Sequence, residues 1–166
     1  EAQFKGPGET IFLPYLSGER TPHNNAAARG AFSGLSQSTD PAQLAQAVME
    51  GVSFAMRDCQ RVLADAGTAI NRLLAVGGGS KSALWLKMLA TNLDMEIALP
   101  EDGDFGGALG AARLGLCAAT GANPMDVMSM PPIKATIAPD TSLSAAYSDQ
   151  YARYRALYPA IEEASS

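Results

Sequence analysis

Three consecutive glycines interrupt the segment LLAVGGGSKSALW, residues 73–85, between an apolar run and a stretch with helical spacing. Glycine loses more backbone freedom on folding than other residues, so Gly77, Gly78 and Gly79 indicate a sharp turn or a close approach of the backbone. A helix that starts after them would offer N–H groups without intrahelical partners and the positive end of its dipole. This combination suits an anion, and the natural guest is the phosphate or ribose of a nucleotide.

Two familiar phosphate motifs do not fit these residues. A P-loop needs a glycine directly before Lys-Ser, and that position is Ser80. The dinucleotide-binding fingerprint would place its third glycine at Ser82. Simpler explanations therefore stay open: the glycines form a tight turn, Ser80 or Ser82 caps the next helix, and Lys81 is a solvated surface lysine.

Extended and helical patterns alternate along the chain around these glycines. Short apolar runs predict strands within 9–17, 31–36, 70–76 and 95–100. Helical spacing predicts helices over 41–66, from the glycines to 93, and over 106–121. Such alternation predicts an α/β fold with parallel strands, in which ligands bind beyond the carboxyl ends of the strands. The glycines follow directly after one of these predicted strands.

The helix expected over 41–66 has the clearest start signal. Asp40 is a candidate N-cap, Pro41 suits the first helical position, and Gln43 stands where a capping box would place it. The charged residues of this helix are expected on its polar face; they are Glu50, Arg57, Asp58 and Asp65. One apolar face is expected to comprise Leu44, Val48, Val52, Met56, Cys59, Val62, Leu63 and Ala66.

The C-terminal third of the chain contains two stripes and a proline-rich stretch. Small residues recur every four positions in the helix expected over 106–121, which favours close packing. Residues 122–142 are rich in proline and polar residues, so an irregular connection is expected there. A terminal helix is expected over 143–158, with an aromatic face made of Tyr147, Tyr151, Tyr154 and Tyr158. This face is expected to dock onto the domain; the alternatives are an absent domain or a second copy in a homodimer.

Composition excludes several classes of function. The 12 basic and 17 acidic residues give a net charge of −5, which argues against general nucleic-acid binding. The longest weakly charged run is too short to span a bilayer, so no membrane partner is expected. Cys59 and Cys117 stand far apart within apolar helical patterns, which is typical of reduced cysteines in a cytoplasmic protein. No signal peptide is visible.

Four motifs occur in a fixed order with sensible spacing: FLPYLSGERTPHNNAAARGAFSGLS, AVMEGVSFAMRDCQRVL, LLAVGGGSKSALWLKMLA and EDGDFGGALGAARLGL. Together they resemble the C-terminal domain of the FGGY family of carbohydrate kinases, and within it the xylulokinase branch. Each motif alone is moderately specific, and four in order are strongly so. The resemblance covers residues 9–120, and the tyrosine-bearing end also resembles the family's tail.

The resemblance implies an α/β fold that is the C-terminal half of an actin-like (ribonuclease H-like) ATPase, with a mixed sheet and flanking helices. Residues 1–166 would then be a single domain, the ATP-binding half, and the sugar-binding N-terminal half would be absent. Carried over from the family, Gly78 and Gly79 lie against the nucleotide, and Ser80, Lys81 and Ser82 begin the helix that walls the adenine pocket. The cofactors implied are ATP and the Mg²⁺ carried with it.

The function implied is transfer of the γ-phosphate of MgATP to D-xylulose or a related sugar. The catalytic aspartate is expected in the absent half, so we assign no catalytic and no metal-binding residue here; Asp102 and Asp104 are interpreted as helix caps. The sequence leaves the roles of Glu19, Arg20 and His23 open. The alternatives are an actin-fold module that binds a nucleotide without catalysis of its own, and a structural interaction domain that uses the tyrosine face.

Overall fold

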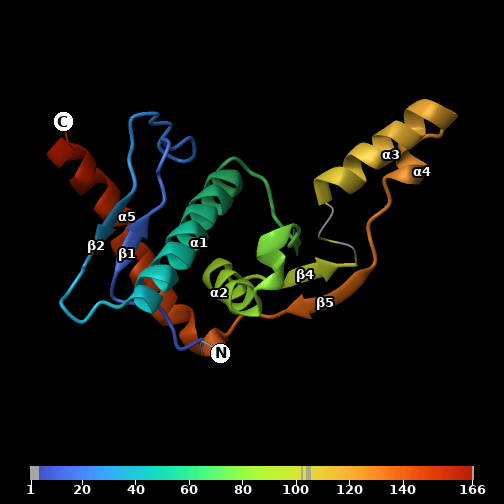
Figure 1. Ribbon diagram of the computed structural model, residues 1–166. Helices are drawn as coiled ribbons and strands as arrows, with labels where there is room; N and C mark the ends of the chain where they lie inside the picture. The colour runs from blue at the N-terminus through green and yellow to red at the C-terminus, as the bar shows by residue number, and fades with distance from the viewer. Residues whose placement is uncertain (1–3, 102, 104–105, 166) are drawn as a thin grey trace.

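The computed structural model describes residues 4–101, 103 and 106–165 of the chain (Figure 1). Within these residues the strands form two small sheets, of order β1-β2 and β3-β4-β5. Helices α1 and α5 pack against β1, and α2 contacts both α1 and α5. Helices α3 and α4 project away from the rest of the chain, beyond the β4–β5 pair (Figure 1).

The first sheet pairs β1 (Ile11–Leu13) with β2 (Ala31–Ser33) in antiparallel orientation. All three residues of β1 are buried, whereas β2 is an edge strand with Phe32 partly exposed. The strands are shorter than the apolar runs that predicted them, and a long connection that includes the polar segment 17–30 joins them.

Helix α1 (Pro41–Asp65) begins where the sequence predicts. The side chain of Asp40 accepts a hydrogen bond from the backbone N–H of Gln43 at 2.8 Å, and the side chain of Gln43 accepts one from the N–H of Asp40 at 2.8 Å. This reciprocal capping box satisfies two donors that a helix start otherwise leaves unpaired. The predicted cap is therefore confirmed.

The buried face of α1 differs from the predicted one. Glu50 and Asp58, expected on the polar face, are only 1% and 4% exposed. Glu50 accepts hydrogen bonds from Gly8, Gln46 and Tyr147, and Asp58 accepts one from Tyr151, so each carboxylate has fixed partners that permit burial. Several residues of the predicted apolar face instead remain exposed: Val48, Met56, Val62 and Leu63.

The second sheet places β3 (Leu73–Leu74) parallel to β4 (Ile97–Pro100), which confirms the predicted parallel pairing. A single 3₁₀ turn, η1 (Gly78–Lys81), and helix α2 (Ala83–Leu93) connect the two strands. The apolar side of α2 packs on this sheet in a cluster of Leu86, Leu89, Ala90, Leu93 and Ile97. The crossover thus fixes the glycines at the end of β3.

The expected irregular connection over 122–142 is wrong in two places. Asn123 caps the short helix α4 (Pro124–Val127), and β5 (Ile133–Ile137) pairs antiparallel with β4. The prolines that suggested a loop lie before and after β5 and not within it, so they do not remove its ladder donors. The sheet is consequently mixed.

Helix α3 (Gly106–Thr120) carries the stripe of small residues, for which close packing is predicted. None of its described residues is buried, and Leu114 and Leu116 are exposed. Its neighbour in the described part of the chain is α4. The stripe is expected to pack on a sheet or on another helix; α3 does contact the helix α4, but among the described residues its side chains are not buried there.

The terminal helix α5 (Ser144–Ser165), preceded by the 3₁₀ turn η3 (Thr141–Leu143), continues past the predicted end at 158. Pro159 lies inside it, where a proline normally weakens a helix. The contacts of Tyr158 and Glu162 with Asn25 hold this final stretch in place. The tyrosines of the predicted aromatic face are all buried in the larger core cluster: Tyr147, Tyr151, Tyr154 and Tyr158. Docking of this face within the chain is thereby confirmed.

Across the described residues, none of the helices combines the length and the apolar character that crossing a membrane would require. Cys59 and Cys117 are unpaired thiols, each half-buried.

Candidate functional site

The glycine turn is built by a left-handed residue and a set of short hydrogen bonds. Gly77 has φ of +82°, a conformation that other residues adopt only with strain. The carbonyl of Gly77 accepts a hydrogen bond from the N–H of Ser80 at 3.1 Å and another from the Ser80 hydroxyl at 2.7 Å. These bonds close the turn and direct the backbone into α2.

The turn lies where the topology favours ligand binding. It follows the carboxyl end of β3, and the loop that follows the parallel strand β4 lies beside it, because Gly77 N–H donates to the carbonyl of Gly103 at 2.9 Å. Crevices at the carboxyl ends of parallel strands are the usual ligand sites of such sheets. Sequence reasoning missed Gly103, although the expected parallel pairing of the two strands was a signal for it.

The structure explains two of the three glycines. Gly77 supplies the positive φ. At Gly79, a Cβ atom would overlap Cζ3 of Trp85 and lie 3.1 Å from Cε3, so the glycine permits close contact with the indole. At Gly78, a Cβ atom would meet nothing within 4 Å, so no feature of the described chain explains that glycine. Gly78 is exposed.

The five predicted binding residues all lie in this one turn. Gly78 and Gly79 begin the turn, and N–H groups at the start of a helical turn have no acceptor inside it. Lys81 is exposed at the end of η1, and Ser82 caps α2 by accepting a hydrogen bond from the N–H of Trp85 at 3.2 Å. The turn therefore presents backbone donors, a cation and a capped helix in one place. That arrangement suits an anionic ligand.

The described residues line several cavities, and two of them are relevant to the site. A cavity of about 350 Å³ lies between the loop over 25–31 and the end of α5. A second cavity, of about 230 Å³, is lined by Gly79, Ser80 and Trp85 together with apolar side chains of α1, α2 and the second sheet. The second cavity borders the glycine turn, so it belongs to the candidate site.

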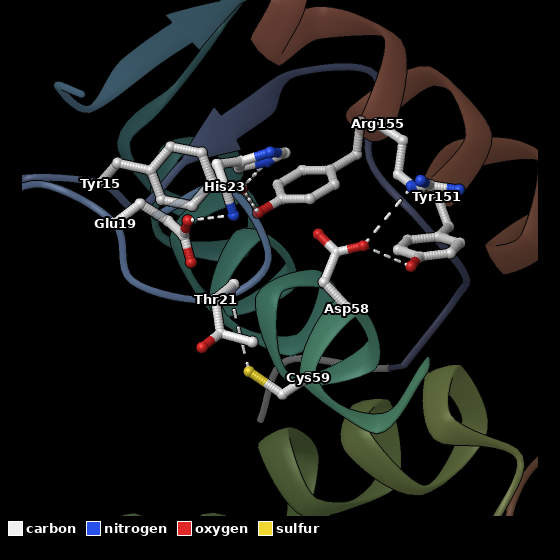
Figure 2. A network of polar contacts seen from close by, with 9 residues as sticks. Tyr15, Glu19, Thr21, His23, Asp58, Cys59, Tyr151 and Arg155 are labelled. Carbon is white, nitrogen blue, oxygen red and sulfur yellow. Dashed lines mark hydrogen bonds and ion pairs between the residues drawn. The ribbon is translucent and has the colours of Figure 1, made fainter. Parts of the chain in front are cut away.

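The segment SGERTPHNN, residues 17–25, forms a loop stabilised by its own polar contacts (Figure 2). The carboxylate of Glu19 accepts a hydrogen bond from the backbone N–H of His23 at 2.7 Å, and Glu19 and Asn25 are joined by two backbone hydrogen bonds. The Cys59 thiol from α1 lies 3.9 Å from the carbonyl of Thr21. Glu19 thus shapes the loop, and Arg20 lies exposed on it.

His23 is held as a packed aromatic side chain. Its ring stacks on Tyr158 with centroids 3.7 Å apart, and Nε2 lies 3.4 Å from the hydroxyl of Tyr15. These contacts join the loop to α5. His23 contacts Glu19, Tyr15 and Tyr158, and none of these residues belongs to the glycine turn.

The acidic side chains of the described residues do not gather into a metal site. Asp58 is committed to Tyr151 at 2.5 Å and to Arg155 at 3.5 Å, as Figure 2 shows. The predictions for Asp102 and Asp104 concern positions outside the described residues.

Known proteins with similar sequences belong to one family of kinases. The family model for the C-terminal domain of the FGGY family of carbohydrate kinases matches residues 1–119. Xylulose kinase of Escherichia coli strain K12 is 41% identical over 151 residues, which make up 89% of this chain and 31% of that protein. The chain thus spans about a third of the length of this curated relative.

Solved structures show the same fold. A xylulose kinase structure from Brucella ovis superimposes with a TM-score of 0.88 at 55% identity, over 98% of this chain and 34% of that one. The xylulose kinase from Rhodospirillum rubrum gives a TM-score of 0.75 at 30% identity, over 93% of this chain and 31% of that one. The predicted fold class, the C-terminal half of an actin-like ATPase fold with a mixed sheet and flanking helices, is confirmed. The chain belongs to the FGGY family of carbohydrate kinases and matches its C-terminal domain.

Proposed function

We propose that this chain is the ATP-binding, C-terminal half of a two-domain kinase that transfers the γ-phosphate of MgATP to D-xylulose or a related sugar. The observation that carries the proposal is Gly78: it lies in the turn after β3, exposed, with nothing within 4 Å of a Cβ atom placed on it. The packing of the described residues does not require a glycine at this position. A phosphate or ribose bound close to the backbone at the end of a strand, next to free backbone donors, would require one.

The residues of the turn have separate roles in this proposal. The N–H groups of Gly78 and Gly79 would face the nucleotide, and the exposed Lys81 would add positive charge beside it. Ser80 closes the turn through Gly77, and Ser82 fixes the start of α2. These two serines therefore position the site and do not need to touch the ligand themselves.

Catalysis requires groups that the described residues do not bring together. Phosphoryl transfer depends on positioning, on charge stabilisation by Mg²⁺ and on a carboxylate that accepts the proton of the attacking hydroxyl. We place that carboxylate and most of the sugar site in an N-terminal domain, with Mg²⁺ arriving on the nucleotide. Phosphoryl transfer would then occur between the two domains.

The relatives support the choice of sugar. Those cited above are xylulose kinases by name, and this chain is up to 55% identical to them. We propose the cytoplasm as the location, because the two unpaired cysteines fit a reducing compartment. A homodimer would need a surface other than the tyrosine face, since those four side chains are buried within the chain.

The test is a coupled assay of ADP release by the full-length product of the gene that carries this sequence. ATP and Mg²⁺ would be supplied with a panel of D-xylulose, D-ribulose, D-gluconate and glycerol. We expect turnover that depends on D-xylulose or a closely related sugar. Binding of ATP without turnover on any sugar would favour the second candidate, a nucleotide-binding module without catalysis of its own.

A further inference from the structure

The indole ring of Trp85 lies directly beneath the glycine turn. A Cβ atom at position 79 would overlap Cζ3 and would lie 3.1 Å from Cε3 and 3.4 Å from Cη2 of this ring. Three atoms of the six-membered ring thus occupy the space next to the Gly79 backbone. Because protein interiors are close-packed, a backbone that rests on a ring follows the position of that ring.

The position of the Trp85 ring is itself fixed from several sides. The backbone N–H of Trp85 donates to the capping hydroxyl of Ser82 at 3.2 Å, which fixes the first turn of α2 and so the point from which the side chain extends. The side chain packs against both hydrophobic clusters, the one around the tyrosines of α5 and the one between α2 and the second sheet. The ring therefore connects the core of the chain to the glycine turn.

The turn has little other packing of its own. A Cβ atom at Gly77 or at Gly78 would meet nothing within 4 Å, and Gly78 and Gly79 are both exposed. Hydrogen bonds from Ser80 and to Gly103 close the turn but leave its outer face open. The three atoms nearest to a Cβ position on Gly79 all belong to Trp85, so this side chain provides the closest packing beneath the turn.

We propose that Trp85 is a positioning residue for the nucleotide: its ring holds the turn so that the N–H groups of Gly78 and Gly79 meet the phosphate or ribose. This inference rests on the proposed function. A large, rigid aromatic ring supports a bare backbone at low conformational cost, and a shorter side chain would leave a gap into which the turn moves. Small displacements of a binding group are enough to weaken a ligand interaction strongly.

The first test measures ATP and sugar kinetics of the full-length gene product with Trp85→Leu and with the milder Trp85→Phe. We expect Trp85→Leu to raise the KM for ATP about tenfold and to leave the KM for the sugar within about twofold, with Trp85→Phe in between. Met88→Val is the matched control, because Met88 is buried on the same helix in the cluster around the tyrosines, and it is not among the residues that line the cavity beside the turn. It should lower the melting temperature without a selective change in the KM for ATP.

The second test is a double-mutant cycle between Gly79→Ala and Trp85→Phe, read as the Kd for ATP by calorimetry on protein shown to be folded by circular dichroism. In the parent, the added methyl group meets the indole, and we expect affinity to fall about tenfold. In the Trp85→Phe background the smaller ring leaves room for the added methyl group. Gly79→Ala should therefore lower the affinity for ATP by less than about threefold.

The outcomes distinguish a failure of the proposed function from a failure of the positioning role of Trp85. A full-length parent that neither binds nor uses ATP contradicts the proposed function, and the role of Trp85 with it. A parent that binds ATP, with parental KM in both Trp85 variants or with equal effects of Gly79→Ala in both backgrounds, contradicts the positioning role alone.

Discussion

The hydroxyl groups of Tyr15 and Tyr154 lie 2.9 Å apart in the core, although 139 residues separate them along the chain. The bond joins the segment after β1 to α5 and so fixes the terminal helix onto the first sheet. Both side chains are nearly fully buried. Their ionisation in the folded state is therefore opposed by the loss of water around them.

This pair predicts a loss of stability in alkali. Burial raises the pKa of Tyr15 from 10.0 to about 12, although its hydrogen bond with Tyr154 acts in the opposite direction. The folded pKa lies above the unfolded one, so the contribution of Tyr15 to stability is fully present below pH 10 and is lost as the pH rises toward 12. Urea unfolding of the parent and of Tyr15→Phe at several pH values from 8 to about 12 measures this effect.

At pH 8 we expect Tyr15→Phe to lower the free energy of unfolding by about 1–3 kcal/mol, because Tyr154 loses its partner. Above pH 10 the variant should lose stability less steeply than the parent, since one titrating group is gone. Parallel pH profiles for the two proteins would contradict the assignment of the alkaline loss to Tyr15.

The buried carboxylate of Glu50 predicts a change of stability in the acidic pH range. Burial raises the pKa of Glu50 above its usual value, although hydrogen bonds from Gln46, Gly8 and Tyr147 lower it in part. The stability it contributes is thus present below the unfolded pKa and is lost as the pH rises through the folded pKa. Glu50→Gln is neutral at every pH, so its stability relative to the parent should improve between pH 4 and pH 7.

The measurement is the free energy of unfolding of the parent, Glu50→Gln and the exposed control Glu96→Gln across that range. The relative stability of the Glu96→Gln variant should change less with pH than that of Glu50→Gln. A Glu50→Gln variant whose stability relative to the parent falls as the pH rises would show that the hydrogen bonds outweigh burial.

Strand β5 predicts a pattern of amide exchange within the proline-rich segment. Residues 133–137 pair with β4, with Ile137 opposite Ile97 and Thr136 opposite Ala98. Their laddered amides should exchange with deuterium more slowly than those of residues 128–130 just before them. Equally rapid exchange across both stretches would support the irregular connection that the sequence suggested.

Local features of this fold could be predicted from the sequence, because their causes lie within a few residues. The capping box of Asp40 and Gln43 depends on neighbours alone, and the turn at Gly77 is closed by its neighbour Ser80. The parallel pairing of β3 and β4 follows from the alternation of strands and helices. The predicted binding residues accordingly lie together in one turn.

Features that depend on distant partners could not be predicted in this way. Glu50 and Asp58 look like surface residues of an amphipathic helix until Tyr147 and Tyr151 of α5 approach them. The contact between Gly79 and Trp85 likewise depends on where α2 packs. The tyrosine hydroxyls, which need partners when buried, were a signal that α1 would offer acceptors.

In the proposed arrangement, this chain binds the nucleotide, and another domain holds the catalytic carboxylate and most of the sugar site. We therefore expect that the 166-residue chain alone does not phosphorylate sugars. The described residues lack a gathered set of carboxylates, and most of the sugar site is proposed to lie elsewhere. A coupled ADP-release assay on the purified, folded chain with the same sugar panel checks this. Sugar-dependent turnover by the chain alone would contradict the proposed two-domain arrangement.

The most direct measurement is the Kd for ATP of the full-length gene product carrying Gly78→Val, by calorimetry on protein shown to be folded. Gly79 is unsuitable because a side chain there would overlap Trp85, whereas a Cβ atom at Gly78 meets no atom of the described residues within 4 Å. Gly115→Val is the matched control, since a Cβ atom at Gly115 on α3 also meets nothing within 4 Å. We predict that Gly78→Val weakens ATP binding at least about tenfold, or about 1.4 kcal/mol, while Gly115→Val binds as the parent does. A folded Gly78→Val protein that binds ATP as tightly as the parent would show that the glycines form only a turn.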